Sequence, residues 1–215
     1  MNNFFHLLKY ELTIYHRNYH LFRHSAYIML LASIILSIML SNEASNEYTK
    51  MTLVLFASVM STVTIPNHLI KTDMQDGTLE NLCAFLRPST IIIAKYCGMI
   101  ISTGFGILCT LPIIAIFYDL PIYHILYLIT IITLILIQII AIVLLGNIIH
   151  AYFKQNTNLI LAIIIPLIIP SLIIASMGMS TLKWDFAFIL LGMDMIFIPS
   201  ILVLSRYLCA GLYEF

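Results

Sequence analysis

Charged residues are scarce in this chain of 215 residues. Asp, Glu, Lys and Arg make up 9% of it, whereas hydrophobic residues make up 61%. The mean hydropathy of +1.03 is too high for a soluble domain of this length. The composition therefore predicts an all-α polytopic membrane protein. The formal net charge of zero gives no indication of a nucleic-acid partner.

Motifs of common enzymes are also missing. The sequence has no HExxH zinc motif, no GxSxG serine elbow, no P-loop and no Rossmann glycine pattern. We therefore expect no catalytic residue, and any energy must come from another chain. The four cysteines have no CxxC spacing, so they support neither a zinc site nor a disulfide framework.

Long apolar runs make up most of the sequence. A membrane crossing needs about 20 apolar residues, and one domain of residues 1–215 holds six such runs. We place the spans at Leu21–Leu40, Met51–Ile70, Tyr96–Tyr118, Ile125–Leu145, Leu159–Met177 and Phe186–Leu204.

The basic residues predict the orientation of these spans. Only Lys50 and Lys183 lie on one side, and the other eight lie opposite: Lys9, Arg17, Arg23, Lys71, Arg87, Lys95, Lys154 and Arg206. Because basic residues collect in cytoplasmic segments, we expect both termini to be cytoplasmic.

The first twenty-odd residues have the pattern of an amphipathic helix on the cytoplasmic leaflet. Apolar and polar residues alternate at helical spacing, and no small-residue cleavage site follows. The row His16, His20 and His24 could ligate a metal, but no carboxylate or cysteine completes a site. A polar face at the headgroup level explains the row more simply, so no metal is expected.

The densest polar run lies between Lys71 and Pro88, after the second span. Asp76-Gly77 is a turn signal, Asp76 or Thr78 could cap a helix start, and Glu80 falls in its first turn. The residue before Pro88 is disfavoured in a helix, so the helix should end there.

The short helix in this run should have one apolar face. Four residues share that face at helical spacing: Leu79, Leu82, Cys83 and Leu86. A helix of two to three turns is unstable alone in water, so it must dock against something.

Prolines and one acid mark the remaining candidate sites. Pro66 in span two and Pro166 and Pro170 in span five should bend their helices, for structural reasons or for gating. Asp194 lies near the centre of span six. A carboxylate at that depth is either functional or a neutral, hydrogen-bonded packing residue.

Two segments resemble the signatures of one family. Residues 75–82 read Gln-Asp-Gly-Thr-Leu-Glu-Asn-Leu, followed by Leu86-Arg87-Pro88 and Lys95. This run resembles the coupling region of ABC-2 type permeases, and it is most similar to the haem exporter protein B (CcmB) family of cytochrome c maturation transporters. Residues 165–173, Ile-Pro-Leu-Ile-Ile-Pro-Ser-Leu-Ile, are similar to the family's second signature.

The resemblance covers essentially the whole chain and implies a permease subunit in a bacterial inner membrane, or less commonly a mitochondrial one. It implies a separate ATP-binding subunit, a second permease copy, a haem-handling membrane protein, a small single-span subunit and a periplasmic haem chaperone. Coupling to the ATPase would use Gln75, Asp76, Gly77, Thr78, Leu79, Glu80, Leu82 and Leu86.

Haem would be handled by other subunits of the complex. This chain has a single tryptophan, Trp184, and no Trp-rich segment, so it offers no evident haem-binding surface. ATP would bind to the partner subunit. Two other readings stay open: a general ABC-2 exporter of another hydrophobic substrate, and a scaffold that does not transport. Asp194 receives no role from the resemblance.

Overall fold

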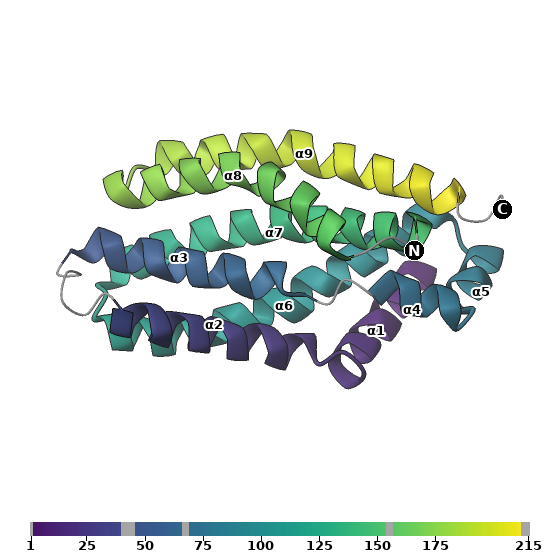
Figure 1. Ribbon diagram of the computed structural model, residues 1–215, viewed down its shortest axis with the longest axis horizontal. Coiled ribbons are helices and arrows are strands. Elements are labelled where there is room, and N and C mark those ends of the chain that lie inside the picture. Colours follow the sequence, from purple (N-terminus) through teal and green to yellow (C-terminus); the bar gives the residue numbers. More distant parts are fainter. Residues whose placement is uncertain (1, 40–45, 66–68, 154–156, 212–215) are drawn as a thin grey trace.

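The computed structural model describes residues 2–39, 46–65, 69–153 and 157–211, and every regular element within these ranges is an α-helix. Long helices lie side by side along the molecule, and three shorter ones gather at one end (Figure 1). The long helices are α2 (Leu21–Met39), α3 (Glu47–Val63), α6 (Pro88–Tyr118), α7 (Ile122–Phe153), α8 (Thr157–Thr181) and α9 (Trp184–Gly211). The shorter ones are α1 (Asn2–Arg17), α4 (Leu69–Gln75) and α5 (Thr78–Phe85).

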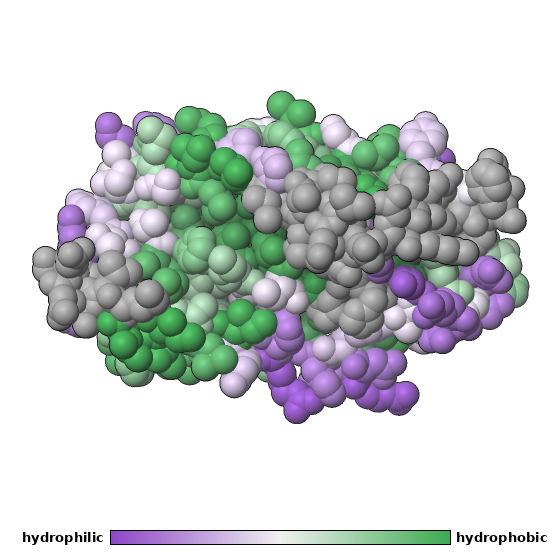
Figure 2. Space-filling model, viewed as in Figure 1, coloured by the Kyte–Doolittle hydropathy of each residue, from purple (hydrophilic) through white to green (hydrophobic). Residues whose placement is uncertain are grey.

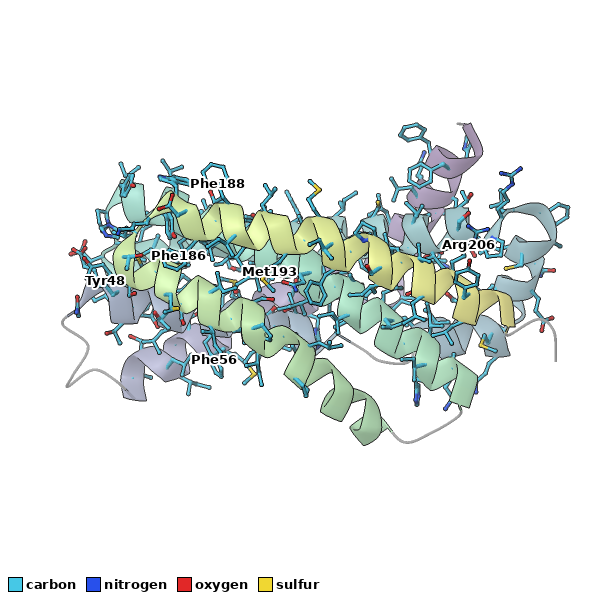
Figure 3. All side chains as sticks on the ribbon, turned by 90° about the horizontal axis from the view of Figure 1, so that it is seen from above. Tyr48, Phe56, Phe186, Phe188, Met193 and Arg206 are labelled. Atoms are coloured by element: carbon cyan, nitrogen blue, oxygen red, sulfur yellow. The ribbon has the colours of Figure 1, made fainter. Side chains whose placement is uncertain are left out.

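Helix α7 forms the centre of the bundle. Its apolar stretch Ile122–Ala151 is 72% buried, whereas those of α2 and α9 are only 22% buried. The outer helices therefore expose apolar side chains, among them Phe56 of α3 and Phe188 of α9, which point away from the bundle (Figure 3). Figure 2 shows hydrophobic residues over the middle of the visible face and hydrophilic residues towards its ends. This distribution is that of a protein surrounded by lipid.

Within the ranges that the structure describes, four helices are long and apolar enough to cross a membrane: α2, α6, α7 and α9. The chain is thus a helical, multi-pass membrane protein, as the composition predicts. Within α8, Pro166–Thr181 is a shorter apolar segment. Helix α3 has 17 residues.

The prediction of one continuous helix from Met51 to Ile70 is wrong. Helix α3 ends at Val63, where the N–H of Thr64 donates to the Met60 carbonyl, and a separate helix, α4, begins at Leu69. The predicted kink at Pro66 lies outside the described residues. A proline disfavours helical geometry at the residue before it, here Ile65, so hydropathy alone extended the span too far.

Close contacts between small polar residues hold α2, α3 and α6 together. The Ser61 hydroxyl donates to the Ser25 carbonyl at 2.7 Å, and the Ser25 hydroxyl lies 3.3 Å from the Thr103 carbonyl. A Cβ atom at Gly106 would lie 2.6 Å from the backbone oxygen of Phe22, so α6 can approach α2 this closely only with glycine there. Such small-residue packing is typical of helices within membranes.

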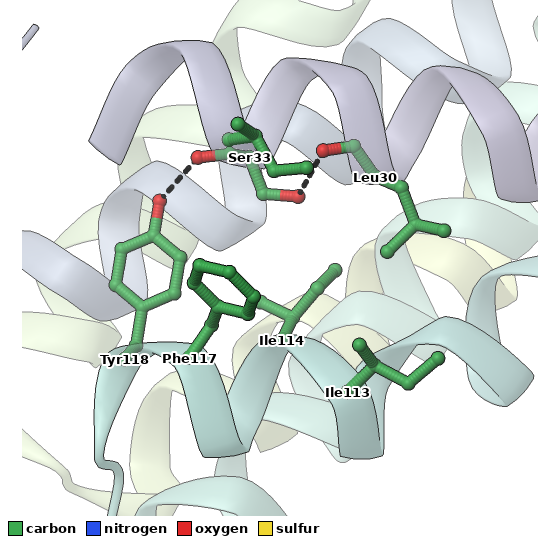
Figure 4. Close-up of a pocket in the computed structure, with 7 residues that line it drawn as sticks. Leu30, Ser33, Ile113, Ile114, Phe117 and Tyr118 are labelled. Atoms are coloured by element: carbon green, nitrogen blue, oxygen red, sulfur yellow. Dashed lines mark hydrogen bonds between the residues drawn. The ribbon is translucent and has the colours of Figure 1, made fainter. Parts of the chain in front are cut away.

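The far end of the bundle, away from α1, α4 and α5, is also tied by hydrogen bonds. The Lys50 ammonium donates to the Tyr118 carbonyl at the end of α6, and the Tyr118 hydroxyl donates to the Ser33 carbonyl at 2.7 Å. The latter bond closes a small apolar cavity of about 40 Å³ between α2 and α6 (Figure 4).

Candidate functional site

The polar run after the second span folds as two short helices at one end of the bundle. Helix α4 is joined to α5 through Asp76 and Gly77, and Gly77 adopts the left-handed conformation with φ +69°. Residues with a Cβ atom rarely adopt this geometry, so the glycine permits the sharp turn. The predicted turn at Asp76-Gly77 is confirmed.

The predicted cap of α5 is wrong. The N-cap position is Gly77, and neither neighbour caps the helix with its side chain. Instead, the Thr78 hydroxyl donates to the Asp73 carbonyl at 2.9 Å and so binds the last turn of α4. The helix ends earlier than predicted, because α5 stops at Phe85 and Leu86 is already extended, two residues before Pro88.

Helix α5 has the two faces that its sequence predicts. The apolar face packs on the core of the chain itself: Leu79 is 1% exposed, and Leu82, Cys83 and Leu86 are half-buried against that core. The opposite side, which we call the outer face of α5, is exposed and consists of Glu80, Asn81, Ala84 and Phe85.

This burial corrects the prediction that Leu79 contacts the ATPase. A residue already enclosed by its own chain has no surface left for a partner. Periodicity shows which residues share a face, but it does not show what that face meets. The exposed aromatic residue is Phe85, at 87% exposure, and Leu82 and Leu86 retain part of their surface. No earlier inference from the sequence singled out Phe85.

A buried ion cluster lies beneath α4 and α5. The ammonium of Lys95, on α6, is 2.5 Å from a carboxylate oxygen of Asp73 on α4 and 2.8 Å from one of Glu11 on α1. Lys95 is 4% exposed and Glu11 is 1% exposed. The contact with Asp73 is a hydrogen bond, whereas Glu11 Oε1 meets Lys95 as an ion pair without hydrogen-bond geometry.

The cluster connects three helices that are far apart in the sequence. Removing one member of a buried ion pair strands the other charge in a medium of low dielectric constant, which costs several kcal/mol. Helices α1, α4 and α6 should therefore move together at this end. In the sequence, Lys95 counts only as one of the basic residues on the cytoplasmic side, and neither Glu11 nor Asp73 stands out as its partner. A charge within the apolar face of an amphipathic helix, such as Glu11, was the available signal.

Tyr15 of α1 lies beside the same cluster and is buried. Burial raises the pKa of its phenol well above the usual value, and the nearby carboxylates of Glu11 and Asp73 raise it further. The phenol therefore stays neutral, so the cluster contains no further negative charge from this residue.

Four of the described prolines lie inside helices that continue past them. Pro166 and Pro170 are in α8, which is visibly bent (Figure 1), as expected where prolines remove backbone donors. Sequence reasoning did not consider two others, Pro112 in α6 and Pro199 in α9. Whether these positions act in gating stays a prediction.

Asp194 is buried in α9, at about the depth of Gln138 in α7. The rings of Tyr127 and Trp184 pack 5.4 Å apart where α7 and α9 begin. Gln138 and Asp194 follow those rings by 11 and 10 residues. At about 1.5 Å per residue, both lie roughly 15 Å further along, near the middle of a 30 Å hydrocarbon layer. Within the described residues, neither side chain has a hydrogen-bond partner.

The comparisons with known proteins cover the whole chain. Residues 2–206 match the family model described as CcmB protein. Uncharacterized protein RP268 of Rickettsia prowazekii (strain Madrid E) is 29% identical over 214 residues, which is 100% of this chain and 99% of the relative. Uncharacterized protein RC0356 of Rickettsia conorii (strain ATCC VR-613 / Malish 7) is 27% identical over the same shares.

Proposed function

Because the chain belongs to the CcmB protein family, we propose that it is the permease subunit of an ABC transporter for cytochrome c biogenesis. Family membership makes it a membrane component of the haem export system for cytochrome c maturation, and a transport protein rather than an enzyme. The permease role is the further step, and it depends on the short helix α5.

The observation that carries the proposal is the division of α5 into two faces. Its apolar face is fixed to the bundle through Leu79, whereas its outer face presents Phe85 to solvent. Exposed aromatic side chains that become buried in a complex often supply much of its binding energy. This arrangement suits a helix that receives movement from a soluble ATP-binding subunit and passes it to the membrane helices.

The path of that movement follows from the ion cluster. A displacement of α5 shifts α4 through the bond from Thr78 to Asp73. Because Asp73 and Glu11 share Lys95, α4 cannot separate from α1 and α6 without stranding a buried charge. The three helices therefore tilt as one unit when ATP binds and is hydrolysed in the partner.

The proposed complex follows from the family. ATP binds to the ATP-binding subunit, and this chain associates with a second permease copy, a haem-handling membrane protein and a small single-span subunit. Haem is held by those partners and by a periplasmic chaperone, and ATP turnover through this permease releases the haem-loaded chaperone. The residues proposed to serve the coupling are Gln75, Asp76, Gly77, Thr78, Glu80, Leu82, Phe85 and Leu86.

The proposed topology has six spans, with α3 and α8 added to the four longer helices. Both termini and the helices α1, α4 and α5 then lie in the cytoplasm. The two described ends of the chain lie at one end of the molecule, near Arg206 (Figures 1 and 3), which supports this proposal. The matched relatives are bacterial, which favours a bacterial inner membrane over a mitochondrial one.

Two other functions make different predictions. A general ABC-2 exporter would not purify with a haem-handling protein, and deleting it would leave cytochrome c levels unchanged. A scaffold would support cytochrome c formation even when the ATP-binding subunit cannot hydrolyse ATP.

The test is purification of a tagged chain from its host in mild detergent, together with cytochrome c measurement. We expect the ATP-binding subunit and a haem-containing membrane protein to purify with it. We also expect cytochrome c to disappear when the nucleotide-binding lysine of the partner is replaced. Unchanged cytochrome c with an inactive ATPase would contradict the permease proposal.

A further inference from the structure

The turn between α1 and α2 concentrates basic side chains at the surface. His16, Arg17, His20 and Arg23 are all exposed, and we call this set the basic turn. His20 adopts a left-handed conformation with φ 49°, an uncommon geometry for a residue with a side chain. Hydrophilic residues protrude at this point of the surface (Figure 2).

The arginines of the basic turn are not neutralised within the part of the chain that the structure describes. Neither Arg17 nor Arg23 forms an ion pair there, since the ion pairs found involve Lys95 and His124. One guanidinium nitrogen of Arg23 donates a hydrogen bond to Nδ1 of His20 at 2.8 Å, which positions the guanidinium but leaves its positive charge without a counter-ion among the described residues. An anion bound here would supply the opposite charge that the two arginines lack among these residues.

Beside the basic turn an apolar groove of about 230 Å³ begins. His16 lines it together with Phe22, Ile101, Ser102 and Phe105. The ring of Phe22 packs 5.5 Å from that of Phe105, which forms one wall. The groove therefore leads from exposed cations onto apolar surface.

A second groove of about 270 Å³ continues from the first between α6 and α7. The two grooves share Ile101 and Phe105, and the second also runs past Gly104, Thr133 and Leu136. Its lining is almost wholly aliphatic or aromatic. The absence of a side chain at Gly104 helps to form the groove, since a Cβ atom there would lie 3.7 Å from Leu136.

We propose that the basic turn and these two grooves form a binding site for one anionic phospholipid of the adjoining leaflet. The phosphate and headgroup lie against Arg17 and Arg23, and an acyl chain follows Phe22 and Phe105 into the groove between α6 and α7. The charge of the turn selects an anion, and the apolar grooves require a long hydrocarbon chain, so a small soluble anion would use only half of the site. The bound lipid would brace α1 against α2 and α6.

The test uses fluorescence from a tryptophan placed in the groove. Trp184 is the single tryptophan, so the variant Trp184→Phe/Phe105→Trp has one reporter in the groove. In detergent–lipid micelles or nanodiscs, quenching by chain-brominated phosphatidylglycerol is compared with quenching by chain-brominated phosphatidylcholine. We expect phosphatidylglycerol to bind at the reporter at least about five-fold more tightly than phosphatidylcholine, as judged from the lipid fraction needed for half-maximal quenching. One cation near an anionic headgroup gives a preference of about this size.

Two control variants identify the cause of the preference. Adding Arg17→Gln and Arg23→Gln should reduce the ratio of the two lipid affinities to nearly one. Arg87 is an exposed basic residue beside α5, and Arg87→Gln should leave this ratio unchanged. A reporter at Ile113→Trp, which is exposed on α6 away from the grooves, should show no preference between the lipids.

Equal quenching by the two lipids at the Phe105→Trp reporter would overturn the proposal. A preference that survives loss of both arginines would overturn it as well. This readout needs no partner subunit and no cytochrome c, so its failure would leave the permease proposal unaffected.

Discussion

Two regions of this molecule bury ionisable side chains, and they do so in opposite ways. Where α1, α4 and α6 meet, Lys95 contacts two carboxylates, those of Glu11 and Asp73. In the middle of the bundle, Asp194 of α9 is buried, and neither of its carboxylate oxygens is hydrogen-bonded within the described residues. The first region contains complementary charges, whereas the second contains one acid that has no counter-ion among the residues that the structure describes.

The difference indicates different roles. A buried lysine between two acids fixes the relative positions of the helices that carry them, because separation would expose each charge to an apolar medium. An acid without partners fixes no neighbour through hydrogen bonds. Because an unpaired charge is costly at that depth, we expect this acid to be neutral. The first region is thus expected to tolerate substitution poorly, and the second is expected to tolerate a neutral amide.

The largest effect should follow from Lys95→Met. The change leaves the buried carboxylate of Glu11 and the partly buried one of Asp73 without a cation, and breaking a buried pair in this way costs about 3–5 kcal/mol. We expect a large fall in the thermal unfolding temperature of the purified chain in detergent and a reduced amount in the membrane.

The matched control for Lys95→Met is the triple variant Glu11→Gln/Lys95→Met/Asp73→Asn. It contains no stranded charge and should recover most of the lost stability, because neutral replacements of a buried ion cluster are often well tolerated. If Lys95→Met alone were as stable as the unmodified chain, the ion cluster would not hold the helices together.

A smaller effect is expected at Gly77, the turn between α4 and α5. Nothing lies within 4 Å of a Cβ atom at Gly77 or at Gly192 of α9, but only Gly77 has a positive φ, +69°. Gly77→Ala should therefore lower the free energy of unfolding by about 1 kcal/mol through backbone strain. Gly192→Ala should not lower it. Unfolding of both variants in the same detergent measures the difference, and equal stability would mean that the turn can relax.

The smallest effect is expected for Asp194→Asn. The amide keeps the shape of the side chain, and no described hydrogen bond is lost. We expect the unfolding temperature to be nearly unchanged and cytochrome c formation to continue. Normal protein levels without cytochrome c would contradict this and would assign a charge or proton role to Asp194.

Local signals in the sequence predicted much of the structure of residues 71–88. The turn at Asp76-Gly77, the end of α5 before Pro88 and the two faces of α5 all depend on residues a few positions apart. At Pro66 a bend within one span was expected, whereas α3 already ends at Val63 and a separate helix begins at Leu69, because hydropathy does not show where a helix ends. The membrane class followed from composition alone.

Long-range contacts could not be predicted. Lys95 was expected only to lie on the cytoplasmic side, and its partners Glu11 and Asp73 come from helices distant in the chain. The burial of Leu79 has the same cause, because an amphipathic pattern does not identify what covers the apolar face. Once that face is known to be internal, Phe85 becomes the exposed aromatic residue of α5.

The most direct test of the account is recovery of the ATP-binding subunit with a tagged chain that carries Phe85→Asp. The control is Phe5→Asp, another exposed aromatic residue, at 61% exposure, on α1 at the same end of the molecule. Loss of a central aromatic contact costs about 2 kcal/mol or more, so Phe85→Asp should reduce recovery by at least about ten-fold. Both variants should accumulate normally, and Phe5→Asp should retain the subunit. Undiminished recovery with Phe85→Asp would contradict the claim that the outer face of α5 meets the ATPase.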